Sequence, residues 1–236
     1  MSTSDATEYV PSQLDSKPQY EIILFDYDDT LVDGQACHRA AWAEGAHKTN
    51  REFPDDSPIT ITPEFISYQK GRPNDKAVRF LGIDPESEKG RSFIDFKKKA
   101  AVANATRARW FPDALATLPR LPERGYEVGI VTSSHRQYVE AGLAACAPLH
   151  FLRTRITARE DYERGKSDPD CLIAACGCAG IPLAGAIYVG DALVDYETTR
   201  AAGCAFLLYS PKGAPSEEGL QGVPYIQSHT DIWRHI

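Results

Sequence analysis

Three acidic residues follow a short apolar run near the start of the chain. Ile22 to Phe25 is unbroken and apolar, which is typical of a strand buried on both faces, and Asp26, Asp28 and Asp29 come directly after it. Asp26 and Asp28 are two positions apart, so an extended backbone points both side chains the same way. Carboxylates that converge at the end of a strand suit a divalent-metal site, an acid–base pair, or both. The alternative is an acidic loop that only caps the strand.

Polar side chains also follow three further predicted strands. Because ligands of open parallel sheets bind at the carboxyl ends of the strands, we expect these side chains to meet the first group of acids. Together they would supply a nucleophilic carboxylate, hydroxyl and amide donors, a fixed cation and acids for a metal, which phosphoryl transfer requires. They are Thr132 and Ser133 after 126–131, Lys166 in the loop after 151–157, and Asp191 and Asp195 after 186–189.

The elements that must position these residues alternate between strands and helices from Trp110 onward, which predicts an α/β fold with a doubly wound parallel sheet. Pro119 and Pro122 must shorten or kink the helix that opens at 111–113, and Gly203 is a good helix end. The predicted strands are 22–25, 126–132, 151–157, 186–189 and 204–208, and the predicted helices between them are 135–146, 168–179 and 193–202.

Residues 35–107 have helical patterns and no strand pattern. The predicted helices are 36–50, 63–70, 74–82 and 85–107, and Asn74 is expected to cap the third of them. We therefore predict an all-helical domain at 35–107, inserted into an α/β core made of 20–34 and 108–236. Residues 1–19 are polar and predict a disordered tail rather than a secretory signal.

The composition excludes several classes of protein. Of the 236 residues 42% are apolar and 25% are charged, as in ordinary globular proteins, and the net charge of −7 argues against nucleic acid as a partner. No apolar run approaches the roughly 20 residues of a membrane span. Without a signal peptide, the six cysteines are expected to be reduced thiols in a cytoplasmic protein.

The sequence resembles the haloacid dehalogenase superfamily over about residues 20–225. The resemblance is to its phosphatase branch with a helical cap inserted after the first motif, as in phosphoglycolate phosphatase-like and beta-phosphoglucomutase-like members. It implies a Rossmann-like core with that cap. The four matching motifs are Asp26-Tyr-Asp28-Asp-Thr30-Leu, Ile130-Val-Thr132-Ser, Lys166-Ser-Asp-Pro-Asp170 and Val189-Gly-Asp191-Ala-Leu-Val-Asp195.

The resemblance implies a mechanism and a cofactor. Asp26 would attack phosphorus to give an aspartyl-phosphate, and Asp28 would protonate the leaving alcohol and then deprotonate the attacking water. Magnesium is implied, since the ligands are all oxygen and the substrate brings phosphate. The residues implied to hold the metal are Asp26, Asp28 through its carbonyl, Asp191 and Asp195, and those implied to hold phosphate oxygens are Thr132, Ser133 and Lys166.

Departures from the family patterns narrow the choice. Haloacid dehalogenases proper and phosphonoacetaldehyde hydrolases lack an acid two residues after the nucleophile, so Asp28 argues against both. Asp29 stands where phosphoglycolate phosphatases usually carry glycine, which leaves the subfamily open. Two alternatives to a phosphatase remain: a phosphomutase, which uses the same residues, and a non-enzymatic binding protein, which has no need of both Asp26 and Asp28.

The substrate is expected to be a small phosphorylated metabolite, chosen by the helical insertion because the core reads only phosphate. Arg72 lies in the most basic stretch of that insertion and is a candidate for substrate binding, with a solvated cation as the alternative. Gly34 and residues 107–110 are the two connections about which a cap could open and close. A monomer and a homodimer are both compatible with the sequence.

Overall fold

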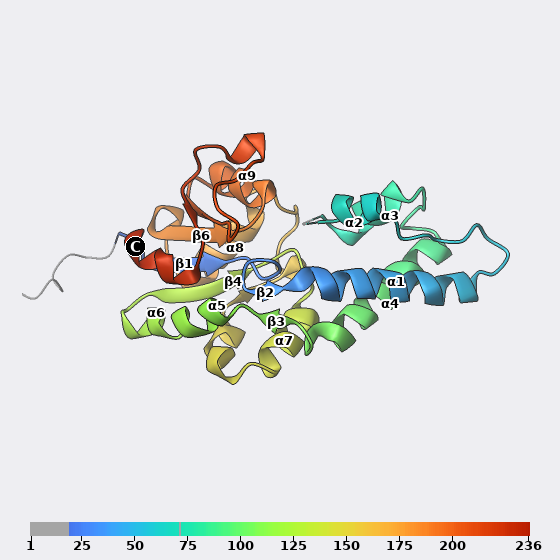
Figure 1. Cartoon of the computed structure of the whole chain (residues 1–236), viewed down its shortest axis with the longest axis horizontal. Coiled ribbons are helices and arrows are strands. Elements are labelled where there is room, and N and C mark those ends of the chain that lie inside the picture. Colours follow the sequence, from blue (N-terminus) through green and yellow to red (C-terminus); the bar gives the residue numbers. More distant parts are fainter. Residues whose placement is uncertain (1–18, 71) are drawn as a thin grey trace, which may run out of the picture.

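The computed structural model describes residues 19–70 and 72–236, so the predicted tail lies outside the described residues except for Gln19. Six parallel strands form one sheet, which confirms the predicted doubly wound fold (Figure 1). Numbered along the chain, these strands lie in the order 3-2-1-4-5-6, and the direction of winding reverses between β1 and β6. In spatial order they are β5 (Ile156–Thr157), β4 (Glu127–Val131), β1 (Ile22–Phe25), β6 (Ala186–Gly190), β7 (Ala205–Tyr209) and β8 (Tyr225–Ile226).

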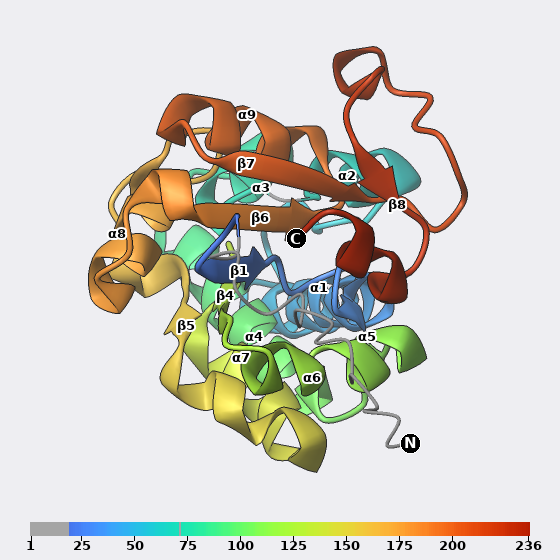
Figure 2. The same cartoon turned by 90° about the vertical axis from the view of Figure 1, so that its left-hand side faces the viewer.

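Helices cover both faces of the sheet (Figure 2). Alternate residues of each strand face opposite sides, so Ile23 and Phe25 belong to one apolar core while Ile22 and Leu24 belong to another. The first core is closed by α5 (Pro112–Thr117), α6 (Arg120–Glu123) and α7 (Arg136–Ala144), and the second by α8 (Asp170–Ala179) and α9 (Leu193–Ala202). β1 is therefore buried on both faces, as its apolar run predicts.

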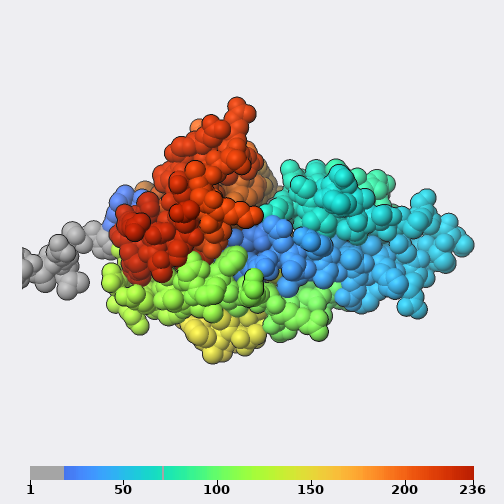
Figure 3. Space-filling model, viewed as in Figure 1, coloured from blue at the N-terminus to red at the C-terminus, as the bar shows by residue number. Residues whose placement is uncertain are grey.

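A helical segment projects from the core between β2 (Val32–Asp33) and β3 (Arg109–Trp110), as Figures 1 and 3 show. β2 and β3 pair antiparallel, so the chain enters and leaves the segment at neighbouring positions. The segment has an apolar core of its own, in which Trp42 contacts the rings of Phe65 and Phe93. Its helices are α1 (Gly34–Glu52), α2 (Pro63–Tyr68), α3 (Asn74–Phe80) and α4 (Glu88–Ala105).

Several local predictions are corrected by the structure. The predicted strand 151–157 is reduced to two residues, because Ala147–Thr154 forms a 3₁₀ helix that buries Leu149 and Leu152. Asn74 does not cap α3; Pro73 holds the capping position, and the Asn74 side chain contacts other residues. β8 was not predicted, since two residues carry no pattern of their own.

The predicted helix break at the prolines and the predicted helix end at Gly203 are confirmed. The prolines divide the predicted helix into α5 and α6, and Gly203 ends α9 in the left-handed conformation with φ of 71°. The six cysteines carry free thiols. Across residues 19–70 and 72–236, none of the helices combines the length and the apolar character that crossing a bilayer requires.

The C-terminal segment is fastened to α5 through Asp113. The Asp113 carboxylate accepts hydrogen bonds from the Ser228 hydroxyl at 2.9 Å and the His229 amide at 2.8 Å, and His229 Nδ1 lies 3.1 Å away. Burial alone would raise the pKa of Asp113, but the contacts from His229 and Ser228 outweigh it and hold that pKa well below its usual range. The ionised form of Asp113 is thus the one that stabilises the fold.

We expect Asp113→Ala to lower the free energy of unfolding by about 2–3 kcal/mol at pH 7, because it removes hydrogen bonds to a charged group. An aspartate whose pKa is lowered in the folded state stabilises the fold at pH values above the pKa of a free aspartate, ~3.9. This stabilisation is lost as the pH falls toward the pKa of the folded state. Urea unfolding should therefore show a difference between wild type and variant that narrows below about pH 4. Asp95→Asn, at an exposed i,i+4 pair with Lys99, is the control, and an equal difference at pH 7 and pH 3 would contradict the assignment.

Candidate active site

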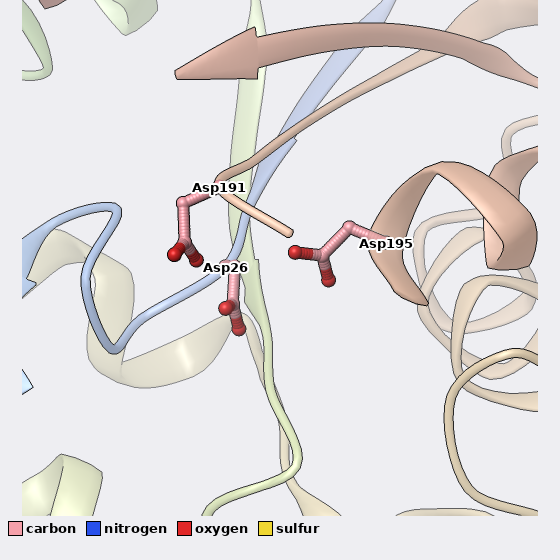
Figure 4. Close-up of side chains that lie close together, drawn as sticks. All are labelled: Asp26, Asp191 and Asp195. Carbon is pink, nitrogen blue, oxygen red and sulfur yellow. The ribbon is translucent and has the colours of Figure 1, made fainter. Parts of the chain in front are cut away.

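Three carboxylates converge where the direction of winding of the sheet reverses (Figure 4). Asp26 follows β1, Asp191 follows β6, and Asp195 lies in the first turn of α9. One oxygen from each lies within 4.8 Å of the others. Gly190 is required for this approach, since a Cβ there would lie 2.6 Å from the Asp195 carboxyl carbon. Such an oxygen cluster could hold a cation.

Lys166 reaches the same cluster from the loop before α8. Its Nζ lies 2.7 Å from Asp26 Oδ1 and 2.8 Å from Asp195 Oδ1, and its side chain is only 2% exposed. Burial alone would lower the pKa of Lys166, but attraction to Asp195 and Asp26 outweighs it and raises that pKa well above the usual range. Tyr188 in β6 also donates to Asp195 Oδ1, at 3.2 Å. Lys166 is therefore a permanent cation fixed between two acids.

The acids carry more negative charge than Lys166 offsets. Burial, opposed in part by Lys166, raises the pKa of Asp26 to about 7, and burial with repulsion from Asp195 and Asp26 raises the pKa of Asp191 well above its usual range. Both shifts have the same cause: three acids lie together, and among the described lysines and arginines only Lys166 lies within 3 Å of any of their carboxylates, with Lys70 at 4.0 Å from Asp191. An additional positive charge would stabilise all three as carboxylates.

Asp28 lies beside this cluster in a set of hydrogen-bond donors. Ser134 Oγ donates to Oδ2 at 2.6 Å, Tyr138 Oη donates to Oδ1 at 2.9 Å, and His38 Nε2 lies 3.1 Å from Oδ1. Burial would raise the pKa of Asp28, but these contacts, with His38 the strongest, lower it. Gly34 allows α1 to start here, because a Cβ would lie 2.2 Å from Asp28 Oδ1. Asp28 is thus held ionised and oriented from both core and helical segment.

The residues after β4 complete the wall of the site. Thr132 is buried, its amide donates to the Thr157 carbonyl at 3.0 Å, and its hydroxyl accepts the Ser134 amide at 3.1 Å. Ser133 lines the same cavity as Asp26 and Lys166. The cavity is about 270 Å³, which suits a small metabolite.

Asp29 connects the core loop to the helical segment. It has a φ of 61°, a conformation that costs a residue other than glycine about 1–2 kcal/mol. Its carboxylate accepts a hydrogen bond from the Gln35 backbone N–H at 3.3 Å and lies 3.3 Å from Lys70 Nζ. The same Nζ is 4.0 Å from the Asp191 carboxylate. The aspartate that replaces the usual glycine therefore brings a cation of the helical segment toward the acid cluster.

Arg72 lines the cavity but is exposed. Its guanidinium lies 4.5 Å from the centroid of the Tyr68 ring and donates to the Tyr68 carbonyl. It makes no contact within hydrogen-bond distance of the described acid cluster. Of the predicted site residues, Arg72 alone is not brought to that cluster and its immediate wall.

Some residues around the cluster were not predicted. These residues all face the acids or Asp28, and they are His38, Lys70, Ser134, Tyr138 and Tyr188. His38 and Tyr138 lie in helices whose apolar pattern gives no signal for a polar role. Ser134, directly after Thr132 and Ser133, could have been included from its position at the strand end.

Comparisons with known proteins identify the family. Residues 23–209 match the family described as haloacid dehalogenase-like hydrolase. The chain is 32% identical over 191 residues to a phosphoglycolate phosphatase of Haemophilus influenzae (79% of this chain, 84% of that one). It is 28% identical over 188 residues to validoxylamine A 7'-phosphate phosphatase of Streptomyces hygroscopicus (78% and 83%). A haloacid dehalogenase-like hydrolase structure from Bacteroides fragilis, 26% identical, superposes with a TM-score of 0.72 over 88% of this chain and 95% of that one.

The chain belongs to the haloacid dehalogenase-like hydrolases. The predicted resemblance is confirmed, and the prediction of a phosphatase-type enzyme is confirmed at the level of enzyme class. The relatives act on unlike molecules, so substrate and mechanism depend on the residues of this chain.

Proposed function

We propose that this protein is a magnesium-dependent phosphatase that hydrolyses a small phosphorylated metabolite through a phosphorylated Asp26. The observation that carries the proposal is the position of Lys166, which binds Asp26 and Asp195 within a cluster of three acids. A buried cation among buried acids is what a site for a phosphoryl group and a metal requires.

Asp26 is the proposed nucleophile, since its carboxylate lies at the end of the central strand and opens onto the cavity. Attack on phosphorus would form an O–P bond to Asp26 and release the alcohol, and water would then hydrolyse that bond. Asp28 is the proposed acid and base: its carboxylate would take up a proton when substrate binds, give that proton to the leaving oxygen, and then take one from the attacking water. The donors around Asp28 hold its carboxylate toward the same cavity.

Charge on the transferred phosphoryl oxygens would be held by three groups of the core. Lys166 supplies the cation, and the Thr132 hydroxyl and the Ser133 amide supply neutral donors at the end of β4. Thr132 is fixed by the hydrogen bonds described above, so it requires little rearrangement when substrate binds. Lys166 also limits repulsion between the acids and the phosphate.

The acid cluster fits a magnesium ion. Carboxylate and carbonyl oxygens are the ligands that Mg²⁺ prefers, and the cluster has more negative charge than Lys166 offsets. Asp26, Asp191, Asp195 and the Asp28 carbonyl would hold the ion. When bound, it would neutralise charge on the phosphoryl oxygens.

We expect phosphate release from a panel of phosphorylated metabolites to require Mg²⁺ and to stop with EDTA. Without substrate, Mg²⁺ at 100 times its Kd should stabilise the fold by about 2.7 kcal/mol. Asp191→Asn should remove this shift and yet be at least as stable as wild type in EDTA, since it relieves repulsion among the acids. Thermal unfolding with and without Mg²⁺ measures both, with Asp95→Asn as the control. An unchanged Mg²⁺ shift in Asp191→Asn would contradict the metal site.

We further propose that residues 35–107 act as a cap over the core formed by 20–34 and 108–236. The cavity has walls from both parts, since Gln69 and Lys70 line it together with Asp26 and Asp191. The ion pair of Lys70 with Asp29 joins the two parts at the edge of the acid cluster. A closed cap would exclude water from the reacting groups and admit only small substrates.

A further inference from the structure

Lys97 is a buried cation of the helical segment that the proposed chemistry does not use. It lies on α4, is 6% exposed, and lines the same cavity as Asp26. Within the described part of the chain, no carboxylate lies within 4 Å of its Nζ. Lys166 shows the contrast, because it is buried to a similar extent but contacts two carboxylates. Among the described residues, the same cavity therefore contains one buried lysine that contacts carboxylates and one that contacts none.

A chain of polar contacts fixes the position of Lys97. Its Nζ donates to Asn74 Oδ1 at 3.1 Å, the Asn74 Nδ2 lies 3.4 Å from His135 Nε2, and His135 Nδ1 lies 2.6 Å from Glu160. Burial lowers the pKa of His135, against the opposing effect of Glu160, so the ring is neutral. A neutral ring that donates to Glu160 from Nδ1 accepts from Asn74 at Nε2, which directs the Asn74 oxygen toward Lys97. The ammonium group is thus oriented by Asn74 of α3 and by His135, which directly precedes α7.

Burial of the Lys97 ammonium group without a carboxylate in contact costs folding free energy. Burial lowers the pKa of Lys97 to about 8, with attraction to Asp28 opposing the shift, and a buried cation without an opposite charge destabilises a fold. The Trp42 ring lies 4.9 Å from Nζ, but a cation–π contact is worth only about 0.5–2 kcal/mol. Lys98, which lines the same cavity, adds positive charge near Lys97. An anion that enters the cavity would remove this cost.

The geometry points to a substrate with two anionic groups: Asp26 receives the phosphoryl group, and Lys97, held in position by Asn74, binds a second anion, a carboxylate or another phosphate. This inference rests on the proposed function and narrows its substrate class. The single cavity that joins Asp26 to Lys97 allows one small molecule to contact both. Neutral sugar phosphates would lack the group that Lys97 is placed to bind.

Binding of inert phosphonates tests the inference without turnover. Methylphosphonate carries one anionic group; phosphonoacetate and 3-phosphonopropionate add a carboxylate at two spacings, and ethylenediphosphonate adds a second phosphonate. Calorimetric titration in Mg²⁺ should show that wild type binds at least one two-anion ligand about tenfold or more tightly than methylphosphonate. The carboxylate and diphosphonate arms identify which anion is preferred.

Lys97→Met should remove this tenfold gain while retaining the affinity for methylphosphonate, and Lys97→Arg should keep part of the gain. Lys99→Met is the matched control, since Lys99 lies on the same helix but is exposed and paired with Asp95. Thermal unfolding should show Lys97→Met at least as stable as wild type, because it replaces an uncompensated buried charge with an apolar chain.

Two outcomes would overturn the inference. One is equal affinity of wild type for methylphosphonate and for every two-anion ligand, and the other is a Lys97→Met variant that keeps the full gain. Both leave the proposed phosphatase function standing as long as methylphosphonate binds. If wild type binds no phosphonate in Mg²⁺, the proposed function itself fails and the inference fails with it.

Discussion

Phosphate release by Asp26→Asn should fall by about 10⁴-fold or more relative to wild type, because an amide cannot replace the attacking carboxylate. The substitution keeps the shape of the side chain and removes one negative charge from a crowded group of acids. We therefore expect the variant to be folded and at least as stable as wild type in EDTA. The measurement is release of inorganic phosphate from the best substrate of the metabolite panel, with unfolding monitored in parallel.

Asp28→Asn separates the two halves of the reaction. Because Asp28 is proposed to act in both steps, the labelled substrate should be an aryl phosphate, whose leaving group needs little protonation. Phosphorylated Asp26 should then accumulate, so protein incubated briefly with this substrate and quenched in acid should carry label. Asp26→Asn should carry none, and Asp95→Asn, an exposed acid on α4, should behave as wild type. Retention by Asp26→Asn of activity within tenfold of wild type would contradict the assignment of the nucleophile.

Lys166→Met should lower the free energy of unfolding by about 3–5 kcal/mol in EDTA. The reason is that Lys166 is the close counter-charge of Asp26 and Asp195, and its loss leaves buried acids uncompensated. Mg²⁺ should restore part of the loss, since it brings positive charge to the same carboxylates. Urea unfolding with EDTA and with Mg²⁺ measures both changes.

Two further variants make this test specific. Adding Asp195→Asn to Lys166→Met should recover part of the stability, because it removes one of the two unpaired charges. Lys48→Met, at an exposed i,i+4 pair with Glu44, should change the free energy of unfolding by no more than about 0.5 kcal/mol. A loss in Lys166→Met as small as that of Lys48→Met would show that Lys166 does not hold the acids together.

The sequence predicted the fold and the acids because both depend on local patterns. A buried parallel strand is a run of apolar residues, and the carboxyl end of that strand is where a ligand binds, so Asp26 and Asp191 could be located without coordinates. The prediction of a strand at 151–157 was wrong because the first part of that stretch belongs to a 3₁₀ helix, whose side chains Leu149 and Leu152 are buried. A short apolar run is compatible with a buried helix as well as with a buried strand, so the sequence pattern alone does not separate the two.

Two sets of contacts could not be predicted: the donors around Asp28, and the series of polar contacts that links Lys97 to Glu160 through Asn74 and His135. His38 lies in the helical segment and Tyr138 in α7, and nothing in either helix indicates that both meet the same carboxylate. His38 and Tyr138 are far apart in the sequence, so whether they meet depends on how the helical segment packs on the core. Arg72 shows the converse: its basic surroundings were visible in the sequence, but its stacking on Tyr68 was not.

The antiparallel pair of β2 and β3 brings the two ends of the helical segment together. Asp33 and Arg109 face each other in this pair, so the two covalent connections of the segment from 34 to 108 to the rest of the chain lie side by side. A segment whose two ends are neighbours can be lengthened, shortened or exchanged without moving the sheet that receives it. Recombination at two adjacent positions would therefore exchange the proposed cap, and with it the proposed choice of substrate, while the aspartates proposed to carry out the reaction stay unaltered.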